Sequence, residues 1–437
     1  MTNRLDLLRA LGLPVYKRQQ TTNGLKQPDL FRATVFVTPN ERTVIDIQAP
    51  QTKVFLKHDP SRLLPKRSLL LDTAWRAAYM LGLSTCYVEL LYTGAKWQIT
   101  AITPVQRAIQ HDPDYLHRPM LLSQSSTDEE HALTLGVDIE ALIVRNDKTI
   151  VMASDVFPRE GEIGTDGLMY RDQRGFGHYP VLEIRLKPKR TAEALFDTLR
   201  QTLVSLQHQL EQKFPDASSN FALYAGCAPH PHFSLGGHVH ARGVKLTMDG
   251  LRRFDLYLAL PLLALAPRTC AARLKRYGYL GDIRFKRHGG FEYRTLPSWM
   301  VDPWLTRYVL LIWEALVRTM VRDERDHTSS LFLNDPTPLW HPLAHHLAHF
   351  DPSSEEDVQR LRRLASLVMK DLEDRLHEEW NRRLVYAEAS FASGKEAWHL
   401  EASPQLMASV QWVRKRLQEG WRWEDKTNIL PLWLMLE

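Results

Sequence analysis

Four short runs of this sequence each carry two ionisable side chains separated by a single apolar or aromatic residue. The pairs are Asp138 and Glu140 in GVDIEALI, Glu183 and Arg185 in LEIR, His238 and His240 in GGHVH, and Glu292 and Arg294 in FEYR. In an extended strand, side chains two positions apart point to one face about 6 to 7 Å apart, so each pair can contact one ligand. If the four strands are neighbours, that face becomes a charged trough, which is costly to build unless something charged fills it.

Each pair taken alone also fits the solvent-facing side of an ordinary amphipathic strand, and for any one pair this is the more common case. Four pairs between positions 138 and 294, two of them beside glycines, favour a binding site. Gly236 and Gly237 would let a bulky partner approach the backbone closely beside the histidines.

The residue types in these pairs indicate the ligand. Carboxylate oxygens suit Mg²⁺, which usually keeps phosphate oxygens and water as its other ligands. Arginine forks suit phosphate oxygens and the charge that develops during phosphoryl transfer. Together they predict a nucleoside triphosphate bound with two or more divalent ions. The sequence has no GxxxxGK[ST], GxSxG or HExxH motif and no GxGxxG after a strand, so side chains and metals would hold the phosphates.

A second group of histidines lies in the segment WHPLAHHLAHF. His341, His345 and His349 are spaced at i, i+4 and i+8, which places them on one face of a helix. They could bind a transition metal, but no carboxylate lies close by on that face. We therefore predict that these histidines lie on the surface or pack against neighbouring side chains.

The order of the predicted elements places the trough in the middle of the chain. A chain of 437 residues exceeds one compact core of ordinary size, so two or three units are expected. The pattern of residues 1–128 predicts a small mixed α/β module. The polar segment 123–131 is the best candidate for a linker between this module and the next unit. The pattern of residues 129–330 predicts a unit of strands with crossing helices, and this unit carries the site. The pattern of residues 331–437 predicts a helical C-terminal part. The fold class is α+β.

Local patterns define single elements within these units. Alternating β-branched residues predict N-terminal strands in RATVFV, TVIDIQ and KVFLK, and a helical apolar period predicts a helix in LLLDTAWRAAYMLG. A capping box of Ser353 with Glu356 predicts the start of a long C-terminal helix.

Several classes of protein are not favoured. No stretch reaches the ~20 apolar residues of a membrane span, and the charged N-terminus is atypical of a signal peptide, so a cytoplasmic protein without a membrane partner is expected. Cys86, Cys227 and Cys270 are far apart, which predicts neither a disulfide framework nor a zinc cluster. The net charge of +5 fits phosphorylated ligands or nucleic acid, but no nucleic-acid-binding signature is present. The oligomeric state stays open.

An ordered set of motifs between Leu133 and Ser298 resembles the phage-like type 2 carboxylate-amine ligases, predicted amidoligases of the glutamine synthetase and glutamate-cysteine ligase superfamily. The motifs are GVDIEALI, GEIGTDG, LEIR, GGHVH, YGYLGDIR and FEYRTLPS. The resemblance implies a glutamine synthetase-like catalytic domain with a curved, mostly antiparallel sheet and packed helices. It also implies ATP and two or more Mg²⁺ ions, with small-molecule or peptide carboxylates and amines as substrates.

The resemblance implies roles for individual residues as well. The implied metal ligands are Asp138, Glu140, Glu183 and Glu292. Arg284 and Arg294 would face the transferred phosphoryl group. His238 and His240, together with Arg185, would contact the bound nucleotide and its phosphates.

The predicted reaction is the ATP-dependent joining of a carboxylate to an amine through an acyl phosphate. Asp166, in the loop 159–167, would orient the amine or accept its proton. Asp138 stands where glutamine synthetase has a glutamate, and the ammonium-site loop of that enzyme has no counterpart, so ammonia is not the expected amine. Two alternatives stay open: a metal-dependent hydrolase that uses the same residues without ATP, and a non-catalytic nucleotide- or nucleic-acid-binding protein.

Overall fold

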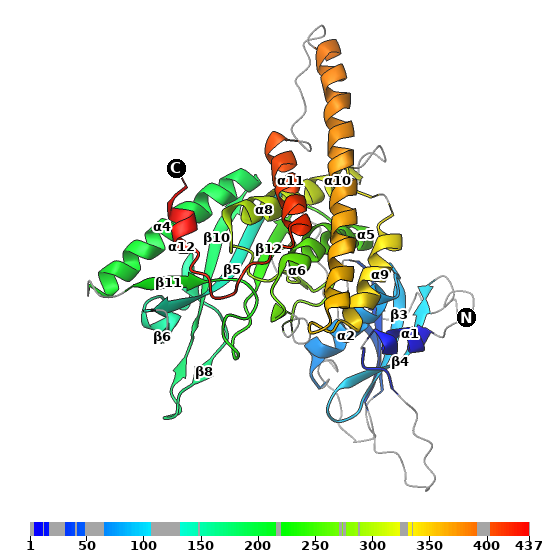
Figure 1. Ribbon diagram of the computed structural model, residues 1–437. Helices are drawn as coiled ribbons and strands as arrows, with labels where there is room; N and C mark the ends of the chain where they lie inside the picture. The colour runs from blue at the N-terminus through cyan, green and yellow to red at the C-terminus, as the bar shows by residue number, and fades with distance from the viewer. Residues whose placement is uncertain are drawn as a thin grey trace.

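The computed structural model describes residues 4–11, 13–16, 31–39, 42–48, 65–105, 132–146, 149–215, 220–270, 273, 277–286, 289–323, 331–333, 335–390 and 403–436. Within them the chain forms a four-stranded sheet near the N-terminus, an eight-stranded sheet in the middle, and a layer of helices (Figure 1). Neighbouring strands of both sheets run antiparallel. This confirms the α+β class predicted from the sequence.

The N-terminal sheet has the order β2-β1-β3-β4. Its strands are β1 (Arg32–Val37), β2 (Arg42–Gln48), β3 (Cys86–Tyr92) and β4 (Trp97–Pro104). Helix α2 (Arg67–Met80) packs against this sheet, and the short α1 (Arg4–Ala10) contacts β4. We refer to these six elements as the N-terminal module. The predicted strand at 53–57 and the predicted linker at 123–131 lie outside the described residues.

The central sheet has the order β13-β14-β12-β5-β10-β7, and β6 and β11 also pair with β5. Its strands are β5 (Thr134–Arg145), β6 (Thr149–Val151), β7 (Ile163–Thr165), β10 (Val181–Lys189), β11 (Phe221–Tyr224), β12 (Gly237–Arg242), β13 (Ile283–Phe285) and β14 (Phe291–Tyr293). A short 3₁₀ turn, η3 (Ala153–Asp155), follows β6. The hairpin of β8 (Tyr170–Arg171) and β9 (Gly177–His178) extends from the sheet (Figure 1).

Helices pack together beside the central sheet and hold it in place. They are α4 (Ala192–Lys213), α5 (Met248–Phe254), the π-helical turn η4 (Asp255–Ala259), α6 (Leu260–Leu265), α8 (Pro303–Asp323), α9 (Thr337–Ala348), α10 (Glu355–Ser390), α11 (Pro404–Gln418) and α12 (Leu430–Leu434). Helix α4 contacts β5 and β10, and α8 packs against α4, α5 and α11. One apolar cluster includes Trp75 of α2, Val239 of β12 and Leu372 of α10, so a single core joins the three parts of the chain.

The predicted capping box at the start of α10 is displaced by one residue. The backbone N–H of Asp357 donates to the hydroxyl of Ser354 at 3.2 Å. Ser353 instead donates to Asp351 through its own hydroxyl, at 2.7 Å. Two consecutive serines precede acidic residues here, so the local sequence is compatible with both registers, and the contact of Ser353 with Asp351 leaves Ser354 to cap the helix.

The cysteines correct another expectation. Cys227, just after β11, and Cys270, just after α6, form a disulfide across a sequence separation of 43 residues. Cys86 is free and buried. The expectation of no disulfide was wrong because the fold, rather than the spacing of the cysteines, brings the two segments together. Among the described residues, no helix is both long and apolar enough to cross a membrane.

Candidate functional site

The four predicted pairs lie on four neighbouring strands of the central sheet. Asp138 of β5 stands opposite His238 of β12 and Arg185 of β10. Glu140 stands opposite Glu183 in the same register. Residues opposite one another on neighbouring strands have side chains on the same face. The structure therefore assembles the trough that the sequence predicts.

The strand order separates charge along this trough. Glu292 and Arg294 lie at the end formed by β14, and Arg284 of β13 stands opposite Glu292. The two histidines of β12 lie in the middle. Beyond them, β5 and β10 carry most of the acids. The trough thus has a cationic end on β13 and β14 and an acidic end on β5 and β10.

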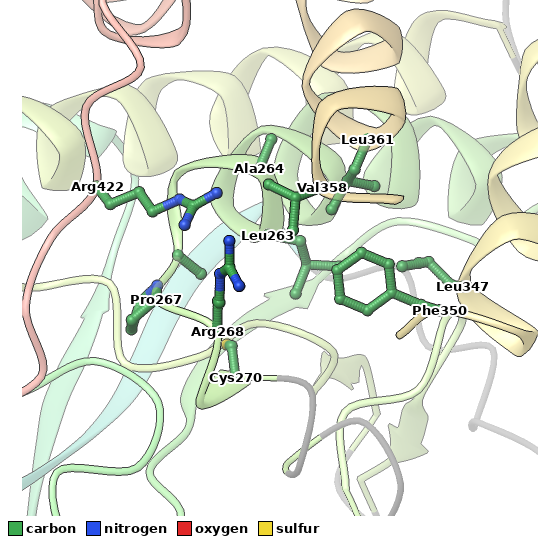
Figure 2. A pocket seen from close by; sticks show the side chains of 11 residues that line it. Leu263, Ala264, Pro267, Arg268, Cys270, Leu347, Phe350, Val358, Leu361 and Arg422 are labelled. Atoms are coloured by element: carbon green, nitrogen blue, oxygen red, sulfur yellow. The ribbon is translucent and has the colours of Figure 1, made fainter. Parts of the chain in front are cut away.

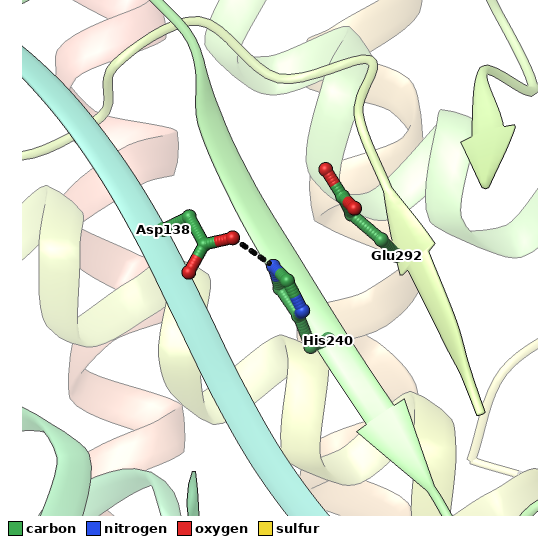
Figure 3. Close-up of side chains that lie close together, drawn as sticks. All are labelled: Asp138, His240 and Glu292. Carbon is green, nitrogen blue, oxygen red and sulfur yellow. Dashed lines mark ion pairs between the residues drawn. The ribbon is translucent and has the colours of Figure 1, made fainter. Parts of the chain in front are cut away.

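One group of potential metal ligands comprises Asp138, His240 and Glu292, and we call it the Asp138 group. Its three residues come from β5, β12 and β14 and face one another (Figure 3). Nε2 of His240 lies 2.9 Å from Oδ2 of Asp138. Each residue offers one ligand atom, and these atoms lie within 4.8 Å of one another.

A second group comprises Glu140, Glu183 and His238, and we call it the Glu140 group. Oε2 of Glu140 accepts a hydrogen bond of 2.7 Å from the backbone N–H of Gly236. Glu183 forms an ion pair with Arg185. Nδ1 of His238 lies 3.2 Å from Oε1 of Glu292, so the two groups are adjacent.

The pKa shifts of Glu140 and Glu183 indicate that these two carboxylates lack full compensating positive charge, whereas burial would raise the pKa of Asp138 but its contact with His240 holds it below the ordinary value. Burial, with a further contribution from the nearby carboxylate of Asp166, raises the pKa of Glu140 to about 8. Burial likewise raises the pKa of Glu183 to about 7, although Arg185 opposes the shift. Burial lowers the pKa of His238 despite its contact with Glu292, which favours a neutral imidazole. A cation bound here would compensate these carboxylates, and a neutral imidazole has a free lone pair for it.

The histidines themselves fit a metal. Nδ1 of His238 and Nε2 of His240 are buried, and each lies beside a carboxylate of the trough, but neither makes a hydrogen bond of suitable geometry with the residues that the structure describes. Buried polar atoms normally have such a partner. Two carboxylates and one imidazole per group form a donor set that suits Mg²⁺ or Mn²⁺.

Glu292 is the centre of the cationic end. Its carboxylate is fully buried, and it accepts a bidentate contact from Arg284, with Nε at 2.8 Å and Nη2 at 2.7 Å. Nζ of Lys286 lies 2.6 Å away, and Nε of Arg294 lies at 3.4 Å. Burial alone would raise the pKa of Glu292, but the two imidazoles and Arg284 hold it well below its usual range. Three cations around one carboxylate leave positive charge available to an anionic ligand.

Lys286 is a residue that the sequence reasoning missed. It lies two positions after Arg284 in the run IRFK, so the same i, i+2 rule would have placed both side chains on one face. The signal was present, but a lysine directly after a short strand also fits an ordinary solvent-facing residue.

A pocket of about 380 Å³ adjoins the trough. Among its lining residues are Glu140, Asp166, His238 and Arg294, all of which were predicted site residues. It is also lined by residues that the sequence reasoning did not single out, namely His232, Ser234, Arg273, Tyr277 and Asp282. Four of these residues lie in loops and Arg273 has helical backbone, and no periodic pattern in the sequence marks any of them.

Arg273 and Asp282 hold the wall of this pocket. Nη1 of Arg273 donates to the backbone carbonyl of Thr295 at 2.8 Å, and Nη2 donates to that of Arg294 at 3.2 Å. The backbone carbonyl of Asp282 accepts from the N–H of Arg294 at 2.8 Å. These contacts fix the backbone around Arg294.

Two predicted site residues make contacts within the protein. The guanidinium of Arg185 is occupied by Glu183 and by the backbone carbonyl of Thr165, which accepts from Nη2 at 2.6 Å. Its contacts therefore anchor the loop before Asp166. The carboxylate of Asp166 accepts a hydrogen bond of 2.8 Å from the N–H of Leu168, which shapes the turn that carries it.

The histidines of α9 and of its C-terminal cap belong to neither group of potential ligands. The rings of His345 and His349 are 4.8 Å apart, and Nδ1 of His349 lies 3.0 Å from the carbonyl oxygen of His345. These local contacts are typical of helix-surface histidines, as the sequence predicts.

A smaller pocket lies next to Cys270, between α6, α9 and α10 (Figure 2). Its volume is only about 20 Å³, and it is lined mainly by apolar side chains such as Leu263 and Phe350, with Arg268 and Arg422 at its edge. A space of this size holds about one water molecule. The pocket beside the trough is therefore the better candidate for a substrate.

Comparison with known proteins agrees with this geometry. No curated protein matches the chain significantly. Residues 135–337 match the family described as phage phiEco32-like COOH.NH2 ligase-type 2, and this segment contains every residue of the trough. The match confirms the resemblance seen in the sequence: the segment 135–337 is similar to the phage phiEco32-like type 2 carboxylate-amine ligases.

Proposed function

We propose that this protein is an ATP-dependent ligase that joins a carboxylate to an amine, with its active site in the trough and the adjoining pocket. The observation that carries the proposal is the separation of charge along one sheet, with acids at one end, imidazoles in the middle and three cations around Glu292 at the other end. A metal–nucleotide complex has the complementary pattern, since its metal ions bind to acids and its phosphates to cations.

In this proposal the two groups hold the divalent cations. The Asp138 group would supply Asp138, His240 and Glu292, and the Glu140 group would supply its two glutamates and His238. Metal ions bound there would neutralise phosphate charge as the nucleophile approaches. The implied glutamine synthetase-like catalytic domain agrees with a site on one face of an antiparallel sheet.

Arg284, Arg294 and Lys286 would together bind the phosphates. All three contact Glu292, so they lie close enough together to face one polyphosphate chain. Arginine forks stabilise the charge on the transferred phosphoryl group when they are held in place before the reaction. The contacts of Arg273 and Asp282 with the backbone of Arg294 provide such positioning.

The reaction has two steps. A carboxylate oxygen of the first substrate attacks the γ-phosphorus of ATP, and the bond from this phosphorus to the β-phosphate oxygen breaks. ADP leaves, and the substrate becomes an acyl phosphate. The amine nitrogen then attacks the acyl carbon, the carbon–oxygen bond to phosphate breaks, and an amide and inorganic phosphate remain. The amine must lose a proton in this step, and Asp166 at the pocket wall is the residue that we assign to orient the amine or accept that proton.

The pocket would admit the carboxylate and the amine, as small molecules or as the ends of peptides. Its lining mixes acids with arginines and histidines, which suits polar, charged substrates. The division of the chain into 1–128, 129–330 and 331–437 stays a prediction, as does a cytoplasmic location.

A hydroxamate assay tests the proposal. Hydroxylamine, a small and strong nucleophile, should intercept an acyl phosphate and give a hydroxamate when the natural amine is absent. Product should require ATP, Mg²⁺ and a suitable carboxylate from a pool of amino acids and peptides, and it should be lost in Arg294→Ala. A carboxylate that stimulates ADP release without ever giving hydroxamate would exclude the acyl phosphate. Turnover of a substrate without ATP would instead indicate a hydrolase.

A further inference from the structure

Asp255 is a fully buried carboxylate outside the trough, and four donors converge on it. Its Oδ2 accepts from the hydroxyl of Tyr79 at 2.5 Å and from Nε1 of Trp340 at 2.7 Å. Its Oδ1 accepts from the hydroxyl of Tyr293 at 2.7 Å and from the N–H of Gly281 at 3.0 Å. We call these five residues the Asp255 junction.

Each donor of the junction comes from a different part of the fold. Tyr79 lies on α2 of the N-terminal module, Trp340 on α9, and Tyr293 on β14. Gly281 lies in the loop before β13. Burial raises the pKa of Tyr79 and Tyr293 well above the ordinary tyrosine value, so both hydroxyls keep the protons that they donate.

Tyr293 connects the junction directly to the trough. It lies between Glu292 and Arg294, and successive side chains of a strand point to opposite faces. Glu292 and Arg294 therefore face the trough, while Tyr293 points into the helical layer and is anchored on Asp255. Anchoring this hydroxyl fixes the strand that carries both neighbours.

The N-terminal module also holds the loop that forms the pocket wall. Nε1 of Trp75 donates to the carbonyl of Gly281 at 3.3 Å, and the N–H of the same glycine reaches Asp255. Gly281 has a φ of +68°, and a Cβ at this position would overlap the ring of Tyr79. A side chain is thus excluded there by backbone conformation and by contact with the module.

The N-terminal module also contacts other residues of the segment around Gly281. Nη2 of Arg42 on β2 donates to the carbonyl of Ile283 at 3.3 Å, and its guanidinium lies 4.6 Å from the ring of Trp75. The guanidinium of Arg76 lies 3.9 Å from the ring of Tyr279. On its other side, the loop presents Tyr277 and Asp282 to the pocket.

We propose that the N-terminal module is a built-in positioning element of the active site, which acts through Tyr79 and Asp255 to hold β14 and the loop 277–282 in place. Tyr79 and Asp255 are positioning residues, because they contact the residues that carry the site and not the site itself. The proposal rests on the proposed function for its consequence in catalysis, but its structural part can be tested without any ligand.

Hydrogen exchange of the full-length, ligand-free protein tests that structural part. Tyr79→Phe removes one charge-assisted hydrogen bond and keeps the ring, so amides of the segment 277–295 should exchange roughly tenfold faster. Tyr92→Phe, which removes a hydroxyl from β3 of the same module, is the matched control and should leave this segment unchanged. Wild-type exchange in 277–295 for Tyr79→Phe would overturn the proposal.

If Tyr79→Phe does not fold, Trp75→Phe provides a second test. It removes the donation to the Gly281 carbonyl and part of the buried ring that Arg42 contacts, so it should also speed exchange in 277–295, by roughly threefold. Unchanged exchange in this folded variant would equally overturn the proposal.

Kinetics test the consequence for catalysis. In Tyr79→Phe, kcat for ATP consumption should fall by roughly tenfold while KM for ATP changes less than threefold, because a misplaced Arg294 affects the transition state more than the bound nucleotide. If kcat fell equally in Tyr79→Phe and in the control Tyr92→Phe, the positioning role of Tyr79 would be overturned. A wild-type protein that never consumes ATP would overturn the proposed function instead, and the exchange result would still decide whether the module positions the loop.

Discussion

Nδ1 of His238 lies 3.2 Å from Oε1 of Glu292, and this contact joins the two groups of potential metal ligands. His238 belongs to the Glu140 group, whereas Glu292 belongs to the Asp138 group and also contacts three cations. Glu292 is therefore shared between the acidic and the cationic ends of the trough. A change at either residue should affect both groups.

Neutral variants of the four acids should weaken metal-dependent nucleotide binding. Asp138→Asn, Glu140→Gln, Glu183→Gln and Glu292→Gln each remove one anionic ligand, and the affinity for ATP with Mg²⁺ should fall roughly tenfold or more in isothermal titration. Glu160→Gln, at an exposed loop position, is the control and should bind as the wild type does. Unchanged binding in all four variants would show that the site is elsewhere.

The stability of the metal-free protein should depend on pH through Glu140. Its folded-state pKa of about 8 lies above the ordinary value of 4.5, so the folded protein binds more protons than the unfolded chain between these values. The free energy of unfolding should therefore fall as the pH rises from about 4.5 to about 8. Denaturant unfolding across this range should show a flatter profile for Glu140→Gln, and an identical slope in both proteins would contradict the assignment.

Metal affinity should have the opposite dependence on pH. A divalent cation competes with the proton on Glu140, so binding of Mn²⁺ should strengthen as the pH rises toward 8 and should release protons. Titration calorimetry in buffers of different ionisation enthalpy measures this release. Binding without proton release at pH 7 would indicate that the metal does not displace the proton of Glu140.

The two groups of histidines should differ in importance. His238→Ala and His240→Ala remove buried nitrogens beside the acids, and each should lower ATP turnover at least tenfold, with the larger loss at His238 because it contacts both groups. His345→Ala and His349→Ala, at exposed positions of α9 and of its C-terminal cap, serve as matched controls and should retain turnover. Equal losses in the two sets would mean that this ranking is wrong.

Lys286 should contribute to phosphate binding. Lys286→Met keeps the length of the side chain but removes its charge, so the Kd for ATP with Mg²⁺ should rise roughly tenfold and become less sensitive to salt. Lys96→Met, at an exposed position of the turn between β3 and β4, should change neither quantity. An affinity equal to that of the wild type would remove Lys286 from the cationic end.

Local sequence patterns predicted much of the site because they depend only on the geometry of an extended chain. Alternation placed Asp138 with Glu140 and His238 with His240 on common faces, and the structure agrees. The same rule could have found Lys286, two positions after Arg284. It could not find Arg273 or Asp282, since their contribution arises from backbone contacts with residues that are distant in sequence or on another strand.

The sequence by itself determined which segments become strands and which side chains share a face, because those properties follow from the two-residue period of a strand. Only the tertiary structure decided that Asp138 stands opposite His238, that Cys227 pairs with Cys270, and that Tyr79 reaches Asp255. Each of these contacts joins segments far apart along the chain. Their formation depends on strand order and on the packing of the whole core, which no local pattern specifies.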